Sequence, residues 1–302
     1  MPLRIILLSF MFLLPLLAGC AETSVGPPAQ SGDVTRMSGH LGDYQRTMRD
    51  LYSINDDIKI GEQVMAAQIK EFKRKKVGVD LPRDSALKAR IENIVRRLAP
   101  VTDLPDLPYE VHIFDRPDIA NAYCMPGGKI GVFTGIFDSE KGLVNAASDD
   151  EIAAVLGHEM AHASLRHVTR QLTTLQSIGF FGNLASIFIG QGVGQQAQYA
   201  FNQVFSMGMN IYIPSYTRKY ESQADQAGFY TMSRAHFDPQ AAVNVWTRAA
   251  GKKGAHSKTD FFADHPASAE RARRLEHWLP EAQMLATGKT GLKPAFTTDQ
   301  QL

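Results

Sequence analysis

The chain is constrained most by residues 153–166, which read AAVLGHEMAHASLR and hold His158, Glu159 and His162 in the order H-E-x-x-H. On an α-helix, side chains four positions apart share a face with Cβ atoms about 5–6 Å apart, so both imidazoles can bind one zinc ion at roughly 2.0–2.1 Å. The carboxylate of Glu159 then lies within reach of a water bound to the metal. The metal lowers the pKa of that water, so the carboxylate can take its proton. The spacing therefore predicts a catalytic zinc site that delivers a nucleophile to a peptide carbonyl.

The flanks of this motif argue against a chance occurrence. The neighbouring positions are uncharged, as expected for a helix buried on every side except the one that faces a metal. These positions are Val155, Leu156, Gly157, Met160, Ala161 and Ala163. Ser148 and Glu151 form an S-x-x-E capping box at the start of the helix. Asp149 and Asp150 in the first turn complement the helix dipole.

Composition places the chain among globular proteins, with 302 residues of which 44% are apolar and 21% charged. The net charge is +1. Such a balance creates no strong positive field, so we expect no nucleic acid among the partners.

The N-terminus has the pattern of a secretion signal. Arg4 precedes an apolar run from Ile5 to Leu17, which is too short to span a bilayer as a mature helix. The run ends in L-A-G-C, which resembles the lipobox of bacterial lipoproteins and implies cleavage before Cys20 and acylation of that cysteine. Because Ala21 is not aspartate, the resemblance implies an anchor in the outer membrane.

Four segments are therefore predicted: a signal peptide at 1–19, a flexible tether at 20–42, a zinc metallopeptidase domain at 43–284 and a polar tail at 285–302. The tether is rich in Gly, Pro, Ser and Thr, the composition of a flexible linker. The chain has two cysteines, so acylation of Cys20 leaves Cys124 without an intramolecular partner. We expect Cys124 to be a small buried residue, with an intermolecular bond or a metal contact as the alternatives.

The stretch before the zinc helix predicts two helices and a small sheet. Residues 56–76 and 84–98 carry apolar side chains at helical spacing. A strand is expected at 109–114, and the strands 120–125 and 129–134 flank Pro126-Gly127-Gly128 as a hairpin. An edge strand of this hairpin can pair with an extended peptide, so we expect substrate to lie along it.

An uncharged segment, Gln171 to Thr217, follows the zinc helix and contains six glycines and no Asp, Glu, Lys, Arg or His. Its most apolar part, Ile178 to Ile189, is too short for a membrane span. We expect two helices joined by the Gly-Gln loop Gln191 to Gln196, which cover the cleft or meet an envelope assembly partner. A plain buried helical pair is the alternative.

A catalytic zinc needs a third protein ligand and an open position for water. His167 follows His158 by nine residues, which on a continuing helix places it about 180° away, so we expect it to face away from the metal. The metzincin pattern is excluded because Leu165 and Val168 stand where that class needs glycine and histidine.

Glu221 is the first carboxylate after the motif, since residues 163–220 contain none. Pro214 and Ser215 are expected to open a new helix, on which Asp225 lies one turn from Glu221. We therefore expect Glu221 to be the third ligand. Asp225 is expected to accept the outer N–H of a ligating histidine and fix its orientation. An exposed helical glutamate is the alternative for Glu221.

Several separate motifs together resemble one protein family. They are Asn121-Ala122-Tyr123 with Pro126-Gly127-Gly128, HEMAH at 158–162, ESQAD at 221–225, and His265-Pro266 with Arg271. This set resembles the gluzincin zinc metallopeptidases that include the CAAX prenyl endopeptidases, in their periplasmic lipoprotein branch. It departs from the tetratricopeptide-bearing relatives, because a short polar tail follows the last helix.

The resemblance implies an α+β, mostly helical zincin-type domain with a small β-sheet beside the H-E-x-x-H helix. It implies one zinc ion per chain on His158, His162 and Glu221, with Glu159 as general base and Asp225 behind the ligands. It further implies catalytic roles for His265 and Arg271. The substrate-binding residues that it implies are Asn121, Ala122, Tyr123, Gly127 and Gly128.

His265 has two possible roles at this stage. As a fourth ligand it would displace water and make the enzyme latent, and as a hydrogen-bond donor it would stabilise the oxyanion. A plain surface histidine is the third alternative.

We therefore expect a periplasmic zinc metalloendopeptidase, anchored to the outer membrane, that hydrolyses misfolded or misassembled envelope proteins. The alternative is an outer-membrane assembly factor or chaperone with a latent zinc site. The glutamate of the motif favours the enzyme, because a structural zinc site needs no general base.

Overall fold

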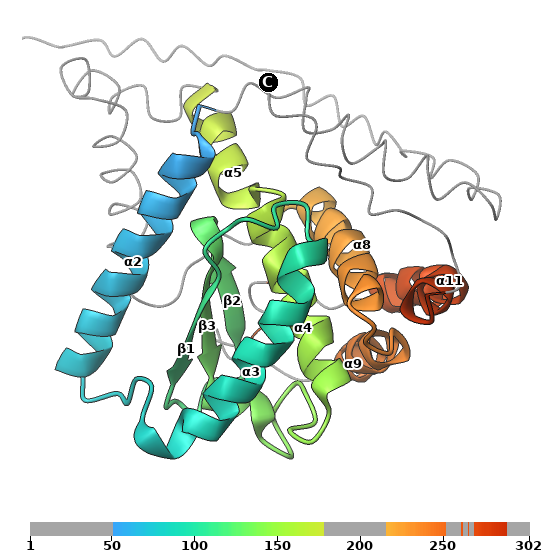
Figure 1. The fold of residues 1–302 in the computed structure, drawn as a ribbon, viewed down its shortest axis with the longest axis horizontal. Helices are drawn as coiled ribbons and strands as arrows, with labels where there is room; N and C mark the ends of the chain where they lie inside the picture. Colours follow the sequence, from blue (N-terminus) through green and yellow to red (C-terminus); the bar gives the residue numbers. More distant parts are fainter. Residues whose placement is uncertain (1–50, 178–215, 252–260, 262–264, 266–268, 289–302) are drawn as a thin grey trace, which may run out of the picture.

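The computed structural model describes residues 51–177, 216–251, 261, 265 and 269–288 (Figure 1). The predictions for the signal peptide, Cys20, the tether and the Gly-Gln loop lie outside these residues. Within them the expected class is confirmed, since one small sheet is surrounded by helices (Figure 1). Among the described residues, no helix combines the length and the apolar character that a membrane span needs.

The elements follow one another as helices, then strands, then helices again. Their bounds are α2 (Ile54–Arg74), α3 (Ser85–Leu98), β1 (Glu110–Phe114), β2 (Ala122–Met125), β3 (Lys129–Phe133), α4 (Asp149–Ser164), α5 (His167–Ser177), α8 (Arg218–Arg234), α9 (Gln240–Gly251) and α11 (Ala269–Ala286). Short 3-10 turns lie at Pro82–Asp84, Ala99–Val101, Pro126–Gly128 and Thr134–Phe137.

The three strands form a mixed sheet in the order β1-β3-β2. β1 runs parallel to β3, and β2 pairs antiparallel with β3, with Cys124 opposite Ile130. Gly127 and Gly128 make the connecting turn with φ angles of 71° and 83°, a conformation that favours glycine. The predicted hairpin is therefore confirmed, and β2 lies at an edge of the described sheet.

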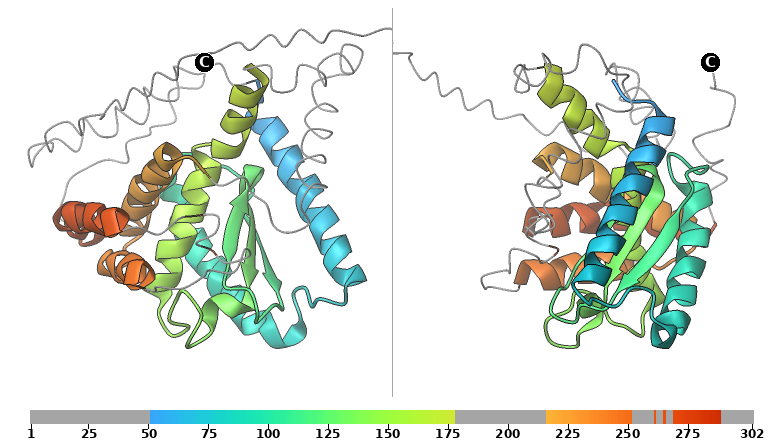
Figure 2. Two further views of the ribbon diagram at one scale, coloured as in Figure 1. Left: turned by 180° about the vertical axis from the view of Figure 1, so that it is seen from behind. Right: turned by 90° about the vertical axis from the view of Figure 1, so that its left-hand side faces the viewer.

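Successive side chains of the strands point to opposite faces of the sheet, and each face has its own helices. Ile113, Ala122 and Ile130 join the core formed with α3 and α4. Phe114 and Phe133 point the other way, toward α2, where the ring of Phe72 meets that of Phe114 edge-on at 4.9 Å. As Figures 1 and 2 show, α2 covers one face of the sheet and α3 and α4 cover the other.

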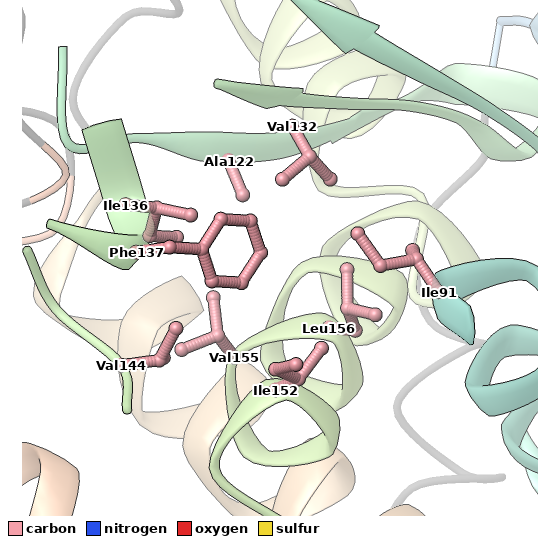
Figure 3. A pocket seen from close by; sticks show the side chains of 9 residues that line it. All are labelled: Ile91, Ala122, Val132, Ile136, Phe137, Val144, Ile152, Val155 and Leu156. Carbon is pink, nitrogen blue, oxygen red and sulfur yellow. The ribbon is translucent and has the colours of Figure 1, made fainter. Parts of the chain in front are cut away.

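A small cavity remains in the core between the sheet, α3 and α4 (Figure 3). Apolar residues line it, among them Ile91, Val132 and Leu156. A space of this kind offers no partner to a charged or hydrogen-bonding ligand, so it is a packing gap of the core.

The H-E-x-x-H helix is α4, and it lies in the centre of the molecule with every residue from Glu151 to Ser164 buried. Ser148 caps it as predicted, because its hydroxyl accepts a hydrogen bond from the Glu151 amide at 3.2 Å. The capping box is incomplete, since the Glu151 carboxylate accepts from the Asn145 amide and from Arg248 instead. Arg248, which is distant in sequence, has therefore taken the place of the Ser148 backbone amide as a partner of Glu151.

Two expected helix boundaries differ from the structure. α8 begins at Arg218, and the side chain of Thr217 caps it by accepting a hydrogen bond from the Tyr220 amide at 3.2 Å. The helix therefore begins later than the expected start at Pro214 and Ser215. α11 continues to Ala286, so its last turn includes the buried Leu285, which the sequence assigned to the tail.

α8 packs along α4 through small side chains. Ala161 of α4 and Ala224 and Ala227 of α8 lie in one buried cluster. At Gly157 and Gly228 the two backbones meet, and a Cβ atom added to Gly228 would lie 2.6 Å from the amide nitrogen of His158. The two helices thus meet backbone to backbone directly beside the first histidine of the motif.

Gly228→Ala is expected to lower the free energy of unfolding by about 1–3 kcal/mol, because the added methyl group must push the two helices apart. Gly251→Ala is the matched control, since a Cβ atom there meets nothing within 4 Å. Urea unfolding of the full chain measures both. Equal stability of the two variants would show that the helices do not need this contact.

Candidate metal centre

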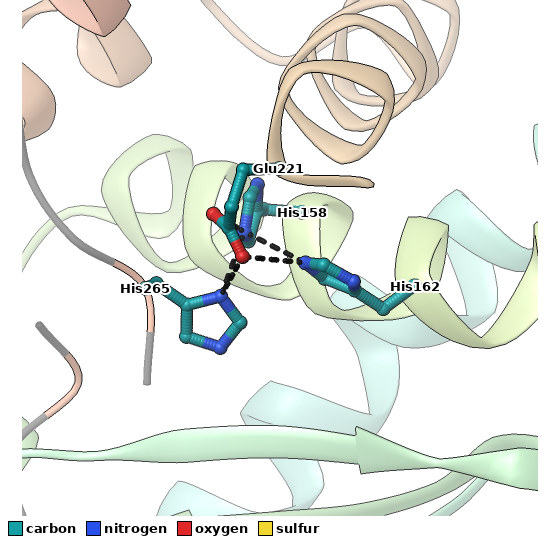
Figure 4. Close-up of side chains that lie close together, drawn as sticks. All are labelled: His158, His162, Glu221 and His265. Atoms are coloured by element: carbon teal, nitrogen blue, oxygen red, sulfur yellow. Dashed lines mark hydrogen bonds and ion pairs between the residues drawn. The ribbon is translucent and has the colours of Figure 1, made fainter. Parts of the chain in front are cut away.

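Four buried side chains converge at the centre of the fold (Figure 4). His158 and His162 come from α4, Glu221 comes from α8, and His265 comes from the segment before α11. One nitrogen or oxygen atom of each lies within 4.8 Å of those of the other three. Among the described residues, this is the group of His, Cys, Asp and Glu side chains that could hold a metal ion.

The separations within the cluster fit a tetrahedral zinc site. Ligand atoms about 2.0–2.1 Å from a tetrahedral zinc ion are roughly 3.3 Å apart. The Nε2 atoms of His158 and His162 lie 3.2 Å apart. Oε2 of Glu221 lies 3.5 Å from Nε2 of His158, and Oε1 of Glu221 lies 3.5 Å from Nε2 of His162. Two imidazoles and a carboxylate are also a donor set typical of zinc, so the residues present fit the metal.

His265 is the fourth member of the cluster and comes from neither α4 nor α8. Its Nδ1 lies 3.3 Å from Nε2 of His158 and 2.8 Å from Oε1 of Glu221. Its Nε2 lies 3.4 Å from Oε1 of Glu159, the buried carboxylate of the motif. The imidazole is 1% exposed, so the structure excludes the alternative of a surface histidine.

Asp225 and Arg271 lie directly behind the cluster. Nδ1 of His158 is 3.3 Å from Oδ1 of Asp225. The guanidinium of Arg271 donates to both oxygens of Asp225, at 2.9 and 2.6 Å, and its third contact is with Glu221 at 2.9 Å. Arg271 therefore faces carboxylates and orients them.

Electrostatics in this cluster follow from burial and from these charges. Burial opposes ionisation of Asp225, but the charges and hydrogen bonds of Arg271 and His158 together outweigh it and lower the pKa of Asp225 to about 2. Burial likewise opposes ionisation of Glu221, but hydrogen bonds from His158 and His265 hold its pKa below the usual range. For His162, burial and the neighbouring His158 keep the pKa well below its usual value. Glu221 is thus ionised and His162 is neutral, which are the forms in which a carboxylate and an imidazole bind a metal.

Comparison with known proteins agrees with this geometry. The model of peptidase family M48 matches residues 85–279, which contain α3, the sheet and all four residues of the cluster. The chain belongs to peptidase family M48.

Similar proteins include metalloendopeptidases from fungi and bacteria. The mitochondrial metalloendopeptidase OMA1 of Schizosaccharomyces pombe is 35% identical over 195 residues, which are 64% of this chain and 53% of that protein. OMA1 of Saccharomyces cerevisiae is 32% identical over 217 residues, 67% of this chain and 59% of its own. The metalloprotease LoiP of Escherichia coli is 26% identical over 194 residues, 64% and 71% of the two chains. The chain thus spans about half the length of the OMA1 proteins.

The five expected substrate-binding residues of this M48 domain all lie in or beside β2. Ala122 and Tyr123 are buried, and the Tyr123 hydroxyl donates to Gln68 of α2. Gly127 and Gly128 pack against Ile58 and Tyr109, so the turn and the contact with α2 account for both glycines. Asn121 lies just before the edge strand and is also buried, and its backbone carbonyl accepts from Phe133.

The structure corrects the expectation for His167. α4 ends at Ser164, and Arg166 adopts a left-handed conformation with φ of 60°. A separate helix, α5, begins at His167, so His167 does not continue the helical period of α4. Nδ1 of His167 lies 2.9 Å from Nδ1 of His162. His167 does not offer a ligand atom to the cluster, but it does not face away from it either. The prediction for His167 was wrong because α4 ends at Ser164, before His167.

Several aromatic residues around the M48 centre were missed from the sequence. Tyr216 stacks on His162 at 3.8 Å, and Tyr220 stacks on His167 at 4.4 Å. The ring of Trp246 lies 5.4 Å from that of His158. Single aromatic residues on helices normally indicate core packing, so the only signal in the sequence was the position of Tyr220 directly before Glu221.

Arg271→Met is expected to destabilise the zinc-free protein by about 3–5 kcal/mol, because two buried carboxylates lose their cation. Arg273→Met is the control, since Arg273 lies on the same helix and is exposed. Urea unfolding in the presence of a chelator measures the difference. If Arg271→Met unfolds like Arg273→Met, Arg271 does not hold the carboxylates in place.

Proposed function

We propose that this protein is a zinc metalloendopeptidase whose zinc ligands are His158, His162 and Glu221. The observation that supports this most directly is the convergence of these three buried side chains, with the buried Glu159 on the same helix as the two histidines. Family membership and the metalloendopeptidase relatives agree with it. Zinc as the metal is inferred from the donor set and its spacing.

The chain's own residues have separate parts in the proposed reaction. Glu159, on the same helix as the two histidines, takes the proton of the attacking water and passes it to the leaving amine. Asp225 and Arg271 hold His158 and Glu221 in position from behind. A zinc ion bound there would polarise the scissile carbonyl and acidify the water. The edge strand β2, which contacts α4, is proposed to pair with the extended substrate.

His265 is proposed to act as a plug that keeps the centre latent. Its Nδ1 lies as close to Glu221 and His158 as a fourth ligand atom would, which favours the plug over an oxyanion donor. Phe261 also lies next to the chain that leads into the edge strand, because its amide donates to the carbonyl of Ala120, two residues before β2, at 3.0 Å. Phe261 in turn stacks on the His265 ring at 4.6 Å. Phe261 and His265 are therefore proposed to lie where the substrate would have to enter.

The natural substrates are proposed to be misfolded or misassembled proteins of the bacterial envelope. The L-A-G-C sequence supports this location, because acylation of Cys20 would anchor the domain to the outer membrane on the periplasmic side. The uncharged segment Gln171 to Thr217 is proposed to meet an assembly partner or to cover the cleft. An assembly factor with a latent zinc site is the second candidate, and the contacts of His265 are the observation that favours it.

Glu159→Gln is expected to retain zinc and to lower cleavage by about 10²–10⁴-fold, because the variant keeps the ligands and loses the general base. Metal analysis and cleavage of casein, an unfolded substrate, measure the two properties. Glu276→Gln is the control, since Glu276 is exposed on α11. Equal cleavage by Glu159→Gln and wild type would remove the peptidase hypothesis.

His265→Ala distinguishes the plug from the oxyanion donor by the sign of its effect. Loss of a plug is expected to raise casein cleavage, with self-cleavage as a further sign. Loss of an oxyanion donor would lower the rate by about 10²–10³-fold. Initial rates of zinc-loaded protein decide between them, and an unchanged rate would contradict both roles.

A further inference from the structure

The ring of His162 has one nitrogen in the metal centre and one outside it. Its Nε2 faces His158 and Glu221, at 3.2 and 3.5 Å. The other nitrogen of an imidazole lies on the far side of the ring, and here it lies 2.9 Å from Nδ1 of His167. The contact is within hydrogen-bonding distance, and both rings are buried.

Proton accounting fixes the direction of this hydrogen bond. A neutral imidazole carries its proton on one nitrogen and a lone pair on the other. If Nε2 of His162 gives its lone pair to a metal, the proton of His162 is on Nδ1 and is donated to His167. Nδ1 of His167 must then be the acceptor, and the proton of His167 is on its Nε2.

The local backbone brings His167 to this point. On a continuing helix, a residue five positions after His162 would lie about 140° around the axis. The left-handed Arg166 ends the helix and redirects the chain, although this conformation costs a non-glycine residue roughly 1–2 kcal/mol. Arg166 is held there by α2 and the chain just before it, since its guanidinium donates to the buried carboxylate of Asp57 in α2 and to the carbonyl of Tyr52.

Helix α8 fixes the two rings from the other side. Tyr216, just before α8, stacks on His162 with an interplanar angle of 20°. Tyr220 stacks on His167 with an angle of 16° and immediately precedes Glu221. Helix α8, which carries the carboxylate ligand, therefore restrains the rotation of the His167 ring, and the residue just before its cap restrains that of His162.

We propose that His167 is a positioning residue that accepts the Nδ1 proton of His162 and so holds His162 with its Nε2 lone pair toward the zinc. This inference rests on the proposed zinc-binding function. His158 has an equivalent partner in Asp225, 3.3 Å from its outer nitrogen. His167 accepts the outer proton of His162 as Asp225 does for His158. Because its ring is neutral, it adds no further negative charge beside the buried carboxylates of Glu221 and Asp225.

Two substitutions separate hydrogen bonding from packing. His167→Phe keeps a ring to stack on Tyr220 but has no acceptor, whereas His167→Asn loses the ring and keeps an acceptor oxygen near the Nδ1 position. We expect His167→Phe to weaken zinc binding by about 10–100-fold, as for other partners of ligating histidines, and His167→Asn to bind close to wild type. Competition with a chromogenic zinc chelator, on the full chain, measures the affinity.

The opposite order of the two variants, or wild-type affinity in His167→Phe, would overturn the proposal. Nitrogen NMR of the histidine-labelled, zinc-loaded wild type tests it without any substitution. We expect the proton of His167 on Nε2 and that of His162 on Nδ1, and a proton on Nδ1 of His167 would refute the inference. If the wild type itself bound no zinc, the proposed function would fail instead, so the two failures are distinguishable.

Discussion

The close packing of α4 against α8 is the contact on which the centre of this protein depends. The two histidines lie on α4 and the carboxylate lies on α8, and neither helix can form the site alone. Gly157 and Gly228 let the backbones approach closely beside His158, and Ala161, Ala224 and Ala227 continue the small surface. Because protein interiors are close-packed, the distance between the two helices fixes the distances between the donor atoms of His158, His162 and Glu221.

Burial of this centre brings an electrostatic cost that the fold must offset. Glu159, Glu221 and Asp225 all lie within the protein, where an unpaired carboxylate is strongly unfavourable. Arg271 pairs with two of them, Glu221 and Asp225, and Nε2 of His265 lies 3.4 Å from the third, Glu159. The donor atoms of the cluster therefore lie on the metal side, and Arg271 balances the carboxylates from the side away from the metal. A metal cation in front would complete the same balance.

Conformational details at helix ends decide the surroundings of the centre. Arg166 ends α4 in a left-handed conformation and is held by Asp57 of α2. This turn brings His167 against His162, which the period of a continuing helix would not allow. Glu151 shows the same effect at the other end of α4, since Arg248 and the Asn145 amide replace the expected cap partner. In each case a residue distant in sequence outweighed a local rule.

By itself, the sequence determined the two histidines and the glutamate of α4, the carboxylates of α8 and the hairpin, because these depend on spacing within one element. Helical period places His158 and His162 together, and two glycines at positive φ make the turn after β2. Only the tertiary structure decided that Arg271 faces Asp225 and Glu221, that His265 is buried in the cluster, and that His167 supports His162. These contacts join segments far apart in the chain or depend on where a helix ends, and both are set by packing against other elements.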